Sequence, residues 1–185
     1  AAPKDAASFA KAGVGHIPQD RLNSALAPSL DITDNMALRE YAMPPIGNGP
    51  WYSAGAARVL ADDIASTAEV RIPDFSMPVR NLSGGNQQRL VARREMRIAS
   101  RLLVAAYPSR GLDIGAIAAM HGYFTALRDQ GVAVVVVSED LGELLNLSDR
   151  LGVLCGGRLM AVLDAKEADI ERIGLLMAGR DGARS

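Results

Sequence analysis

Seven consecutive residues at positions 82–88, Leu-Ser-Gly-Gly-Asn-Gln-Gln, have the types and spacing needed to bind an anion. Ser83 can cap a helix that begins immediately after it, and Gly84 and Gly85 lack a Cβ atom, so the backbone there can approach another molecule closely. The first amide groups of such a helix have no partners within it, and the helix dipole makes this end partly positive. The arrangement suits a phosphate group. Ser-Gly-Gly is also an ordinary junction between a loop and a helix, so the motif needs support from the rest of the chain.

Two other polar positions follow apolar segments. Gln19 comes directly after the apolar stretch 14–18, and Asp113 follows the apolar stretch 102–106 by a short loop. Each has an ordinary explanation, because a Gln after a strand usually faces water and Asp113 can cap a helix that starts at Ile114. The two histidines, His16 and His121, have no Cys or His neighbours at the spacing of metal ligands. We therefore expect no metal site built by this chain alone.

The second half of the chain has the pattern of a parallel sheet. The runs 102–106 and 132–137 are continuously apolar, as expected for strands covered on both faces, and the segment between them is long enough for a crossover helix at 114–130. Beyond this β-α-β unit we expect a helix at 141–147 and a hairpin of strands 151–155 and 158–163. A final helix should span 168–178. Cys155 is expected to be a buried thiol without a reactive role.

The middle of the chain has a broken helical pattern. A helix capped by Thr33 should run to Tyr41, and apolar residues at helical spacing predict a second helix at 57–68. Trp51 and Tyr52 are expected to pack against other residues. Before this region, a short helix at 5–12 should lead into a strand at 14–18. The middle stretch is interpreted as a small helical subdomain.

Composition excludes several classes of protein. The chain has 185 residues, a net charge of −1 and no dense basic run, which argues against nucleic acid as a main partner. Its single cysteine precludes an internal disulfide and fits a reducing compartment. No stretch is long and apolar enough to predict a transmembrane span, and the first residues do not have the pattern of a signal peptide.

With Leu82 before it and Asn-Gln-Gln after it, the Ser-Gly-Gly motif resembles the signature of ABC-transporter ATPases, in the form found in importers of simple sugars and nucleosides. The order of the predicted elements is similar to the latter two thirds of that family's nucleotide-binding domain. The resemblance implies an α/β fold: a partial P-loop NTPase core with a mostly parallel sheet, plus an α-helical subdomain. It places the end of the N-terminal core segment and the Q-loop at 1–21, the helical subdomain at 22–80, and the signature helix with the C-terminal part of the core at 81–185.

The same resemblance implies roles for individual residues. Gln19 falls at the Q-loop glutamine, which makes it a candidate contact for Mg²⁺, and Asp113 falls at the aspartate of the D-loop. In this family two nucleotide-binding domains meet head to tail, and ATP lies between the phosphate loop of one and the signature of the other. The residues expected to contact ATP in trans are Ser83, Gly84, Gly85, Asn86 and Gln87.

Three departures from the family pattern indicate that the chain's own ATP site is degenerate. Where the family has Asp-Glu before the D-loop, this chain has Ala106 and Tyr107, which cannot supply the two carboxylates used in phosphoryl transfer. Where the family has a histidine after the next strand, it has Glu139. No G-x-x-x-x-G-K-[ST] phosphate loop occurs in the sequence, so we expect a fragment that lacks the first strands of its core.

The resemblance therefore predicts the second nucleotide-binding domain of an ABC importer for simple sugars or nucleosides, inactive alone. Its expected partners are the N-terminal nucleotide-binding domain and the transmembrane permease subunits, at the cytoplasmic face of the bacterial inner membrane. ATP and Mg²⁺ would bind only in the assembled transporter. Exposed sheet edges also predict self-association. The alternative is an inert pseudo-ATPase platform that docks the membrane subunits. A soluble ABC-type protein acting on ribosomes or DNA fits less well, because such proteins tend to be more basic.

Overall fold

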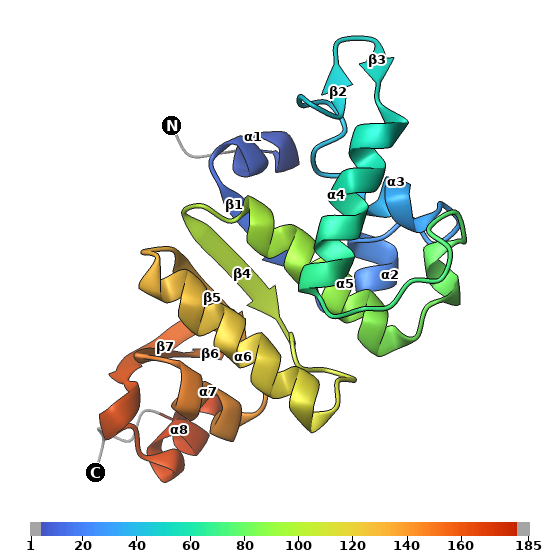
Figure 1. Ribbon diagram of the computed structural model, residues 1–185. Helices are drawn as coiled ribbons and strands as arrows, with labels where there is room; N and C mark the ends of the chain where they lie inside the picture. Colours follow the sequence, from blue (N-terminus) through green and yellow to red (C-terminus); the bar gives the residue numbers. More distant parts are fainter. Residues whose placement is uncertain (1–4, 181–185) are drawn as a thin grey trace. The chain divides into compact units, whose positions relative to one another are not determined.

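A computed structural model describes residues 5–180 of the chain (Figure 1). The chain divides into two compact units, Ala1–Val137 and Ser138–Ser185, and each is described by itself. Within the described residues, none of the helices combines the length and the apolar character that crossing a membrane requires.

The first unit is built on a three-stranded parallel sheet. Its strands are β1 (Val14–Ile17), β4 (Leu102–Ala106) and β5 (Ala133–Val137), in the order β1-β4-β5. Helix α6 (Ile114–Asp129) connects β4 to β5, as a parallel pair requires. The predicted β-α-β unit is therefore confirmed.

The valine-rich strand β5 departs from its prediction as a strand covered on both faces. Val135 and Val137 are 48% and 43% exposed, whereas Leu103 and Ala105 of the central strand β4 are fully buried. Exposed and partly exposed residues alternate along β5, so one face of this strand is uncovered, whereas β4 lies in the middle of the sheet and has buried residues. A continuous apolar run does not by itself distinguish the two positions.

The helical part of the first unit surrounds a separate apolar core. Helices α2 (Arg21–Ser24), α3 (Ile32–Ala37) and α4 (Ala54–Thr67) and the short 3-10 helix η1 (Val79–Asn81) precede α5 (Gly84–Ile98). The fully buried members of this core are Ile32, Met36, Ala57, Ala61, Val79, Leu90 and Val91. The helical character of the segment is as predicted, and the three-part division of the chain stays a prediction. A short helix α1 (Ala6–Lys11), capped by Asp5, leads into β1.

Two details of the helical part correct the sequence predictions. Helix α3 is capped by Asp31, whose carboxylate accepts from the Asp34 amide at 2.7 Å, and not by Thr33; the helix also ends at Ala37 and not at Tyr41. Trp51 and Tyr52 form β3, which pairs with β2 (Gly47–Asn48) in a small hairpin, and Trp51 is 78% exposed. The Trp51 ring does not fill a core, whereas Tyr52 is half exposed and its hydroxyl donates to Asp34 of α3 at 3.0 Å.

The second unit packs a hairpin against short helices. Strands β6 (Arg150–Cys155) and β7 (Arg158–Asp164) are antiparallel, and Gly156 and Gly157 in the turn both have positive φ. The hairpin and α7 (Leu141–Leu147), η2 (Ala165–Glu167) and α8 (Ile170–Met177) share a core of Leu151, Val153, Ala165, Ile173 and Leu176. Cys155, expected to be buried, is partly exposed at the end of β6.

Candidate functional site

The candidate site is the N-terminus of the longest helix of the helical part, α5. Ser83 caps this helix, since its Oγ accepts from the Asn86 amide at 3.4 Å, and Ser83 itself is exposed. The first bond of the helical repeat runs from the Gln87 amide to the Ser83 carbonyl, at 3.0 Å. The amides of Gly84 and Gly85 precede that bond and cannot donate within the helix. The predicted cap is confirmed.

The electrostatics of this helix end favour an anion. The first turn of α5 contains no acidic residue, so no carboxylate competes with an incoming negative charge. The dipole of a helix of 15 residues adds a partial positive charge at the same end. Amides without a partner in the helix, a hydroxyl and a positive dipole together can hold one phosphate group.

Gln87 does not face solvent beside this surface. Its side chain is 4% exposed, and its Nε2 donates to the carbonyls of Val79 at 3.2 Å and Leu82 at 3.1 Å. Its Oε1 accepts from Nε of Arg21 at 3.1 Å. The side-chain amide of Gln87 therefore joins α5 both to the segment before the signature and to the segment that follows Gln19. The contact with ATP predicted for Gln87 stays a prediction.

Gln88 makes the corresponding link on the other side. It is 3% exposed, and its Nε2 donates to the Pro108 carbonyl at 3.0 Å, in the loop between β4 and α6. A Cβ built on Gly85 would lie 3.9 Å from the Gly111 carbonyl of the same loop. The two glutamines of the signature thus attach the start of α5 to the first residue of α2 and to the loop between β4 and α6.

Gln19 and Asp113 lie at the ends predicted for them. Gln19 is exposed and follows the carboxyl end of β1. Its neighbour Asp20 caps α2. The Asp20 carboxylate accepts hydrogen bonds from the side-chain amide and the backbone amide of Asn23, and these bonds, above all the side-chain one, lower the pKa of Asp20. Asp113 caps α6, with its Oδ1 accepting from the Ala116 amide at 2.8 Å. Their roles toward a nucleotide remain predictions.

The positions expected to be degenerate are Ala106, Tyr107 and Glu139. Ala106 ends β4, and Tyr107 follows it with a φ of 51° while its amide donates to the Val137 carbonyl at 2.7 Å. Glu139 belongs to the second unit and is exposed next to Asp140, which caps α7. Neither of the first two side chains carries a carboxylate. Over residues 5–180 there is also no group of three His, Cys, Asp or Glu residues placed to hold a metal ion.

Sequence reasoning missed a buried ion cluster at the centre of the first unit. Arg94 and Glu95, neighbours on α5, have side chains only 3% and 2% exposed, and Arg94 Nε donates to Glu95 Oε1 at 3.0 Å. The other Glu95 oxygen accepts from the His16 amide of β1 at 3.2 Å and lies 3.6 Å from Arg39 Nε. Burial lowers the pKa of Arg94, against the opposing effect of Glu95.

Arg94 also bonds to two backbone carbonyls, so the cluster joins α5 to β1, α3 and the end of α2. Its Nη1 donates to Asn35 of α3 at 2.9 Å, and its Nη2 donates to Ala25 at the end of α2 at 2.8 Å. A cavity of about 290 Å³ lies beside these groups. In the sequence, Arg93-Arg94-Glu95 reads as a solvated helix face, and only the partners from other elements show that half of it is buried.

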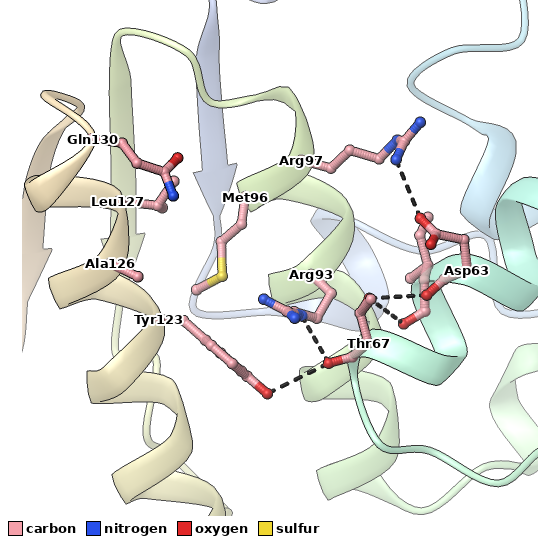
Figure 2. A pocket seen from close by; sticks show the side chains of 10 residues that line it. Asp63, Thr67, Arg93, Met96, Arg97, Tyr123, Ala126, Leu127 and Gln130 are labelled. Carbon is pink, nitrogen blue, oxygen red and sulfur yellow. Dashed lines mark hydrogen bonds and ion pairs between the residues drawn. The ribbon is translucent and has the colours of Figure 1, made fainter.

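A second cavity, of about 250 Å³, lies between α4, α5 and α6 (Figure 2). Figure 2 shows the Arg93 guanidinium over the ring of Tyr123, at 3.9 Å from its centroid. Arg93 Nε and the Tyr123 hydroxyl both donate to the Thr67 carbonyl, at 2.9 and 3.4 Å. Arg97 pairs with Asp63 at 3.2 Å. These polar groups hold the end of α4 against α5, which is a structural role.

No family model matches this chain. It is 40% identical over 169 residues to the guanosine import ATP-binding protein NupO of Bacillus subtilis (strain 168), a match that covers 91% of this chain and 33% of NupO. It is 34% identical over 166 residues to the nucleoside import ATP-binding protein NupA of Lactococcus lactis subsp. cremoris, covering 90% of this chain and 33% of NupA.

A third relative is the glucose import ATP-binding protein TsgD13 of Haloferax volcanii, 36% identical over 174 residues, with 93% of this chain and 32% of TsgD13 covered. The chain thus spans about a third of the length of these relatives. Among solved structures, the dimeric post-hydrolysis state of the ATP-binding cassette MJ0796 bound to ADP and Pi matches with a TM-score of 0.70 and 20% identity. That match covers 88% of this chain and 68% of the cassette, and it shows a shared fold.

Proposed function

Since the chain is a homologue of sugar and nucleoside import ATP-binding proteins and has the fold of an ABC ATPase, we propose that it is the second nucleotide-binding domain of such an importer. Its signature would contact ATP held by the N-terminal nucleotide-binding domain. The assembled transporter would include transmembrane permease subunits for a simple sugar or a nucleoside. The chain would then lie at the cytoplasmic face of a bacterial inner membrane as a peripheral component.

The observation that carries this proposal is the exposed N-terminus of α5. A γ-phosphate held by the partner would meet the Ser83 hydroxyl and the amides of Gly84 and Gly85, with no acidic residue in that turn to repel it. Such preorganised donors stabilise charge that develops in phosphoryl transfer. Asn86 follows on the same turn and is partly exposed.

The residues fit ATP held in trans better than ATP bound and hydrolysed by this chain. Ala106 and Tyr107 offer no carboxylate for Mg²⁺ or for the attacking water, and the exposed Gln19 is the remaining candidate Mg²⁺ contact. Mg²⁺ bound with ATP would neutralise the phosphate charge. Within this proposal the chain alone does not hydrolyse ATP, and the partner domain supplies the phosphate loop and the catalytic carboxylates.

The alternative is a platform that docks the membrane subunits without taking part in hydrolysis. Tyr107 and Glu139 favour it, while the intact cap and glycines at 83–85 favour the first proposal. The two differ in whether the signature matters for turnover.

The test replaces Ser83 by Arg in the chain and measures ATP hydrolysis after mixing with the N-terminal nucleotide-binding domain. A long cationic side chain would occupy the space of the phosphate, so Ser83→Arg should abolish the turnover of the mixture. The matched control is Ser53→Arg, because Ser53 caps α4 in the same way, with its Oγ accepting from the Ala56 amide at 3.2 Å. Turnover lost with the first variant and kept with the control supports the proposal, and turnover kept with both favours the platform.

A further inference from the structure

The link between Arg21 and the start of α5 has a consequence for the signature. Arg21 is the first residue of α2, which begins two positions after Gln19, and α2 packs beside α5 (Figure 1). Its Nε donates to Gln87 Oε1 at 3.1 Å. The same Gln87 amide bonds the carbonyls of Val79 and Leu82, which precede the cap. The side-chain amide of Gln87, a residue that follows Ser83, therefore also holds Val79 and Leu82, which precede Ser83.

Gly84 is part of this arrangement. A Cβ built on Gly84 would lie 2.5 Å from an Nη atom of Arg21, closer than side chains approach one another. The obstacle is the far end of a flexible side chain, so a substitution would push Arg21 aside and would leave the backbone in place. Gly85 differs, because a Cβ there would meet its nearest neighbours at 3.9 Å, an ordinary contact.

We propose that Arg21 is a positioning residue for the signature: it orients Ser83 and the first turn of α5 through Gln87, and Gly84 is a glycine because the Arg21 guanidinium occupies the place of its side chain. The proposal rests on the proposed function for its effect on turnover. A side chain at position 84 would therefore displace Arg21, in addition to keeping a phosphate away from the backbone amides. Displacement of the 19–21 segment would then loosen the signature.

The structural test is amide hydrogen exchange of Asn86, Gln87 and Gln88, measured by NMR on the chain and on five variants: Arg21→Ala, Gly84→Ala, Gly85→Ala and the two double variants with Arg21→Ala. Both Arg21→Ala and Gly84→Ala should lose the hydrogen bond from Arg21 to the Gln87 side chain, and this loss should speed backbone amide exchange in the turn by about five- to tenfold. The double variant of these two should exchange no faster than Arg21→Ala alone. Gly85→Ala should not speed exchange in either background.

Gly84→Ala and Gly85→Ala change helix propensity alike, so the difference between them isolates the effect on Arg21. Exchange unaffected by Arg21→Ala would overturn the proposal. The proposal would also be overturned if the increase in exchange rate in the Gly84→Ala, Arg21→Ala double variant equalled the product of the increases in the two single variants, because independent effects multiply. Far-UV circular dichroism and the unfolding midpoint of each variant show whether it is folded.

The functional readout is the ATPase of the chain mixed with the N-terminal nucleotide-binding domain. Arg21→Ala should lower kcat by about five- to tenfold, the effect of losing one hydrogen bond that orients the signature in the transition state, and should leave the KM for ATP within about twofold, because the partner holds most of the nucleotide. An unchanged kcat in a variant with accelerated exchange would refute the positioning role. A wild-type mixture without turnover would count against the proposed function, while the exchange data would still decide whether Arg21 holds the turn.

Discussion

Replacing Glu95 by Gln should strongly destabilise the first unit. The Glu95 carboxylate lies within 3.6 Å of Arg39 and 3.0 Å of Arg94, and its side chain is 2% exposed. In the variant, the amide oxygen can still accept from either Arg94 Nε or the His16 amide. The Gln Nε2 would then direct its hydrogens toward the remaining donor, and the charge of Arg94 would stay buried without a counterion.

The size of the effect follows from these contacts. Removing one partner of a buried ion pair costs about 3–5 kcal/mol. Arg94 keeps two carbonyl partners, Ala25 and Asn35, which stabilise part of its charge, so we expect the lower end, about 3 kcal/mol. A domain of this size has a total stability of about 5–15 kcal/mol, so a large fraction would be lost.

Urea unfolding followed by far-UV circular dichroism measures this loss. The single tryptophan is a poor probe, because Trp51 is 78% exposed and its surroundings change little on unfolding. The control is Asp62→Asn, which removes an ion pair with Arg58 whose side chains are about half exposed, and should change stability by less than about 0.5 kcal/mol. A loss below about 1 kcal/mol for Glu95→Gln, or one equal to that of the control, would refute the assigned role of the buried cluster.

Three further predictions concern other parts of the first unit. Burial and the hydrogen bond to Asp34, 3.0 Å long, raise the pKa of Tyr52 from 10.0 to about 12. The unfolded chain therefore loses this proton first, and the free energy of unfolding should fall as the pH rises from 10 to 12. Tyr52→Phe should lack this part of the fall, and equal falls in the two proteins would contradict the assignment. Tyr107 has a φ of 51°, a left-handed conformation that Asn tolerates and β-branched residues do not. In urea unfolding, Tyr107→Val should therefore be less stable than Tyr107→Asn by about 1 kcal/mol. The reverse order would argue against a left-handed backbone at this position. Val135→Lys, at an exposed position of the end strand β5, should reduce self-association in sedimentation velocity, whereas an unchanged mass distribution would place the contact elsewhere.

What the sequence predicts well here is local. The cap by Ser83, the crossover helix between two apolar runs and the glycine turn of the hairpin each depend on residues within one or two elements, and all three are present. The resemblance to import ATP-binding proteins starts from the contiguous motif at 82–88, and the 40% identity to NupO extends over 169 residues. Pattern and propensity suffice where the physical partners are close in the sequence.

What the sequence does not predict is which polar side chains are buried. Gln87 and Gln88 look like surface residues of a polar helix, but their partners, Arg21 and Pro108, are 66 and 20 positions away. Glu95 likewise depends on the His16 amide, and Arg94 on the carbonyls of Asn35 and Ala25, all from other elements. Such groups tolerate burial only when all their hydrogen bonds are made, and those bonds exist only in the assembled fold.

We propose that this chain completes an ATP site held by another domain, and ATP hydrolysis is the measurement to make first. The rate should be measured for the chain alone, for the N-terminal nucleotide-binding domain alone, and for their mixture with wild-type chain or with Ser83→Arg. We expect no turnover by the chain alone, turnover by the mixture, and its loss with Ser83→Arg. Turnover by the isolated chain, or a mixture that hydrolyses ATP equally well with Ser83→Arg, would refute the proposed role.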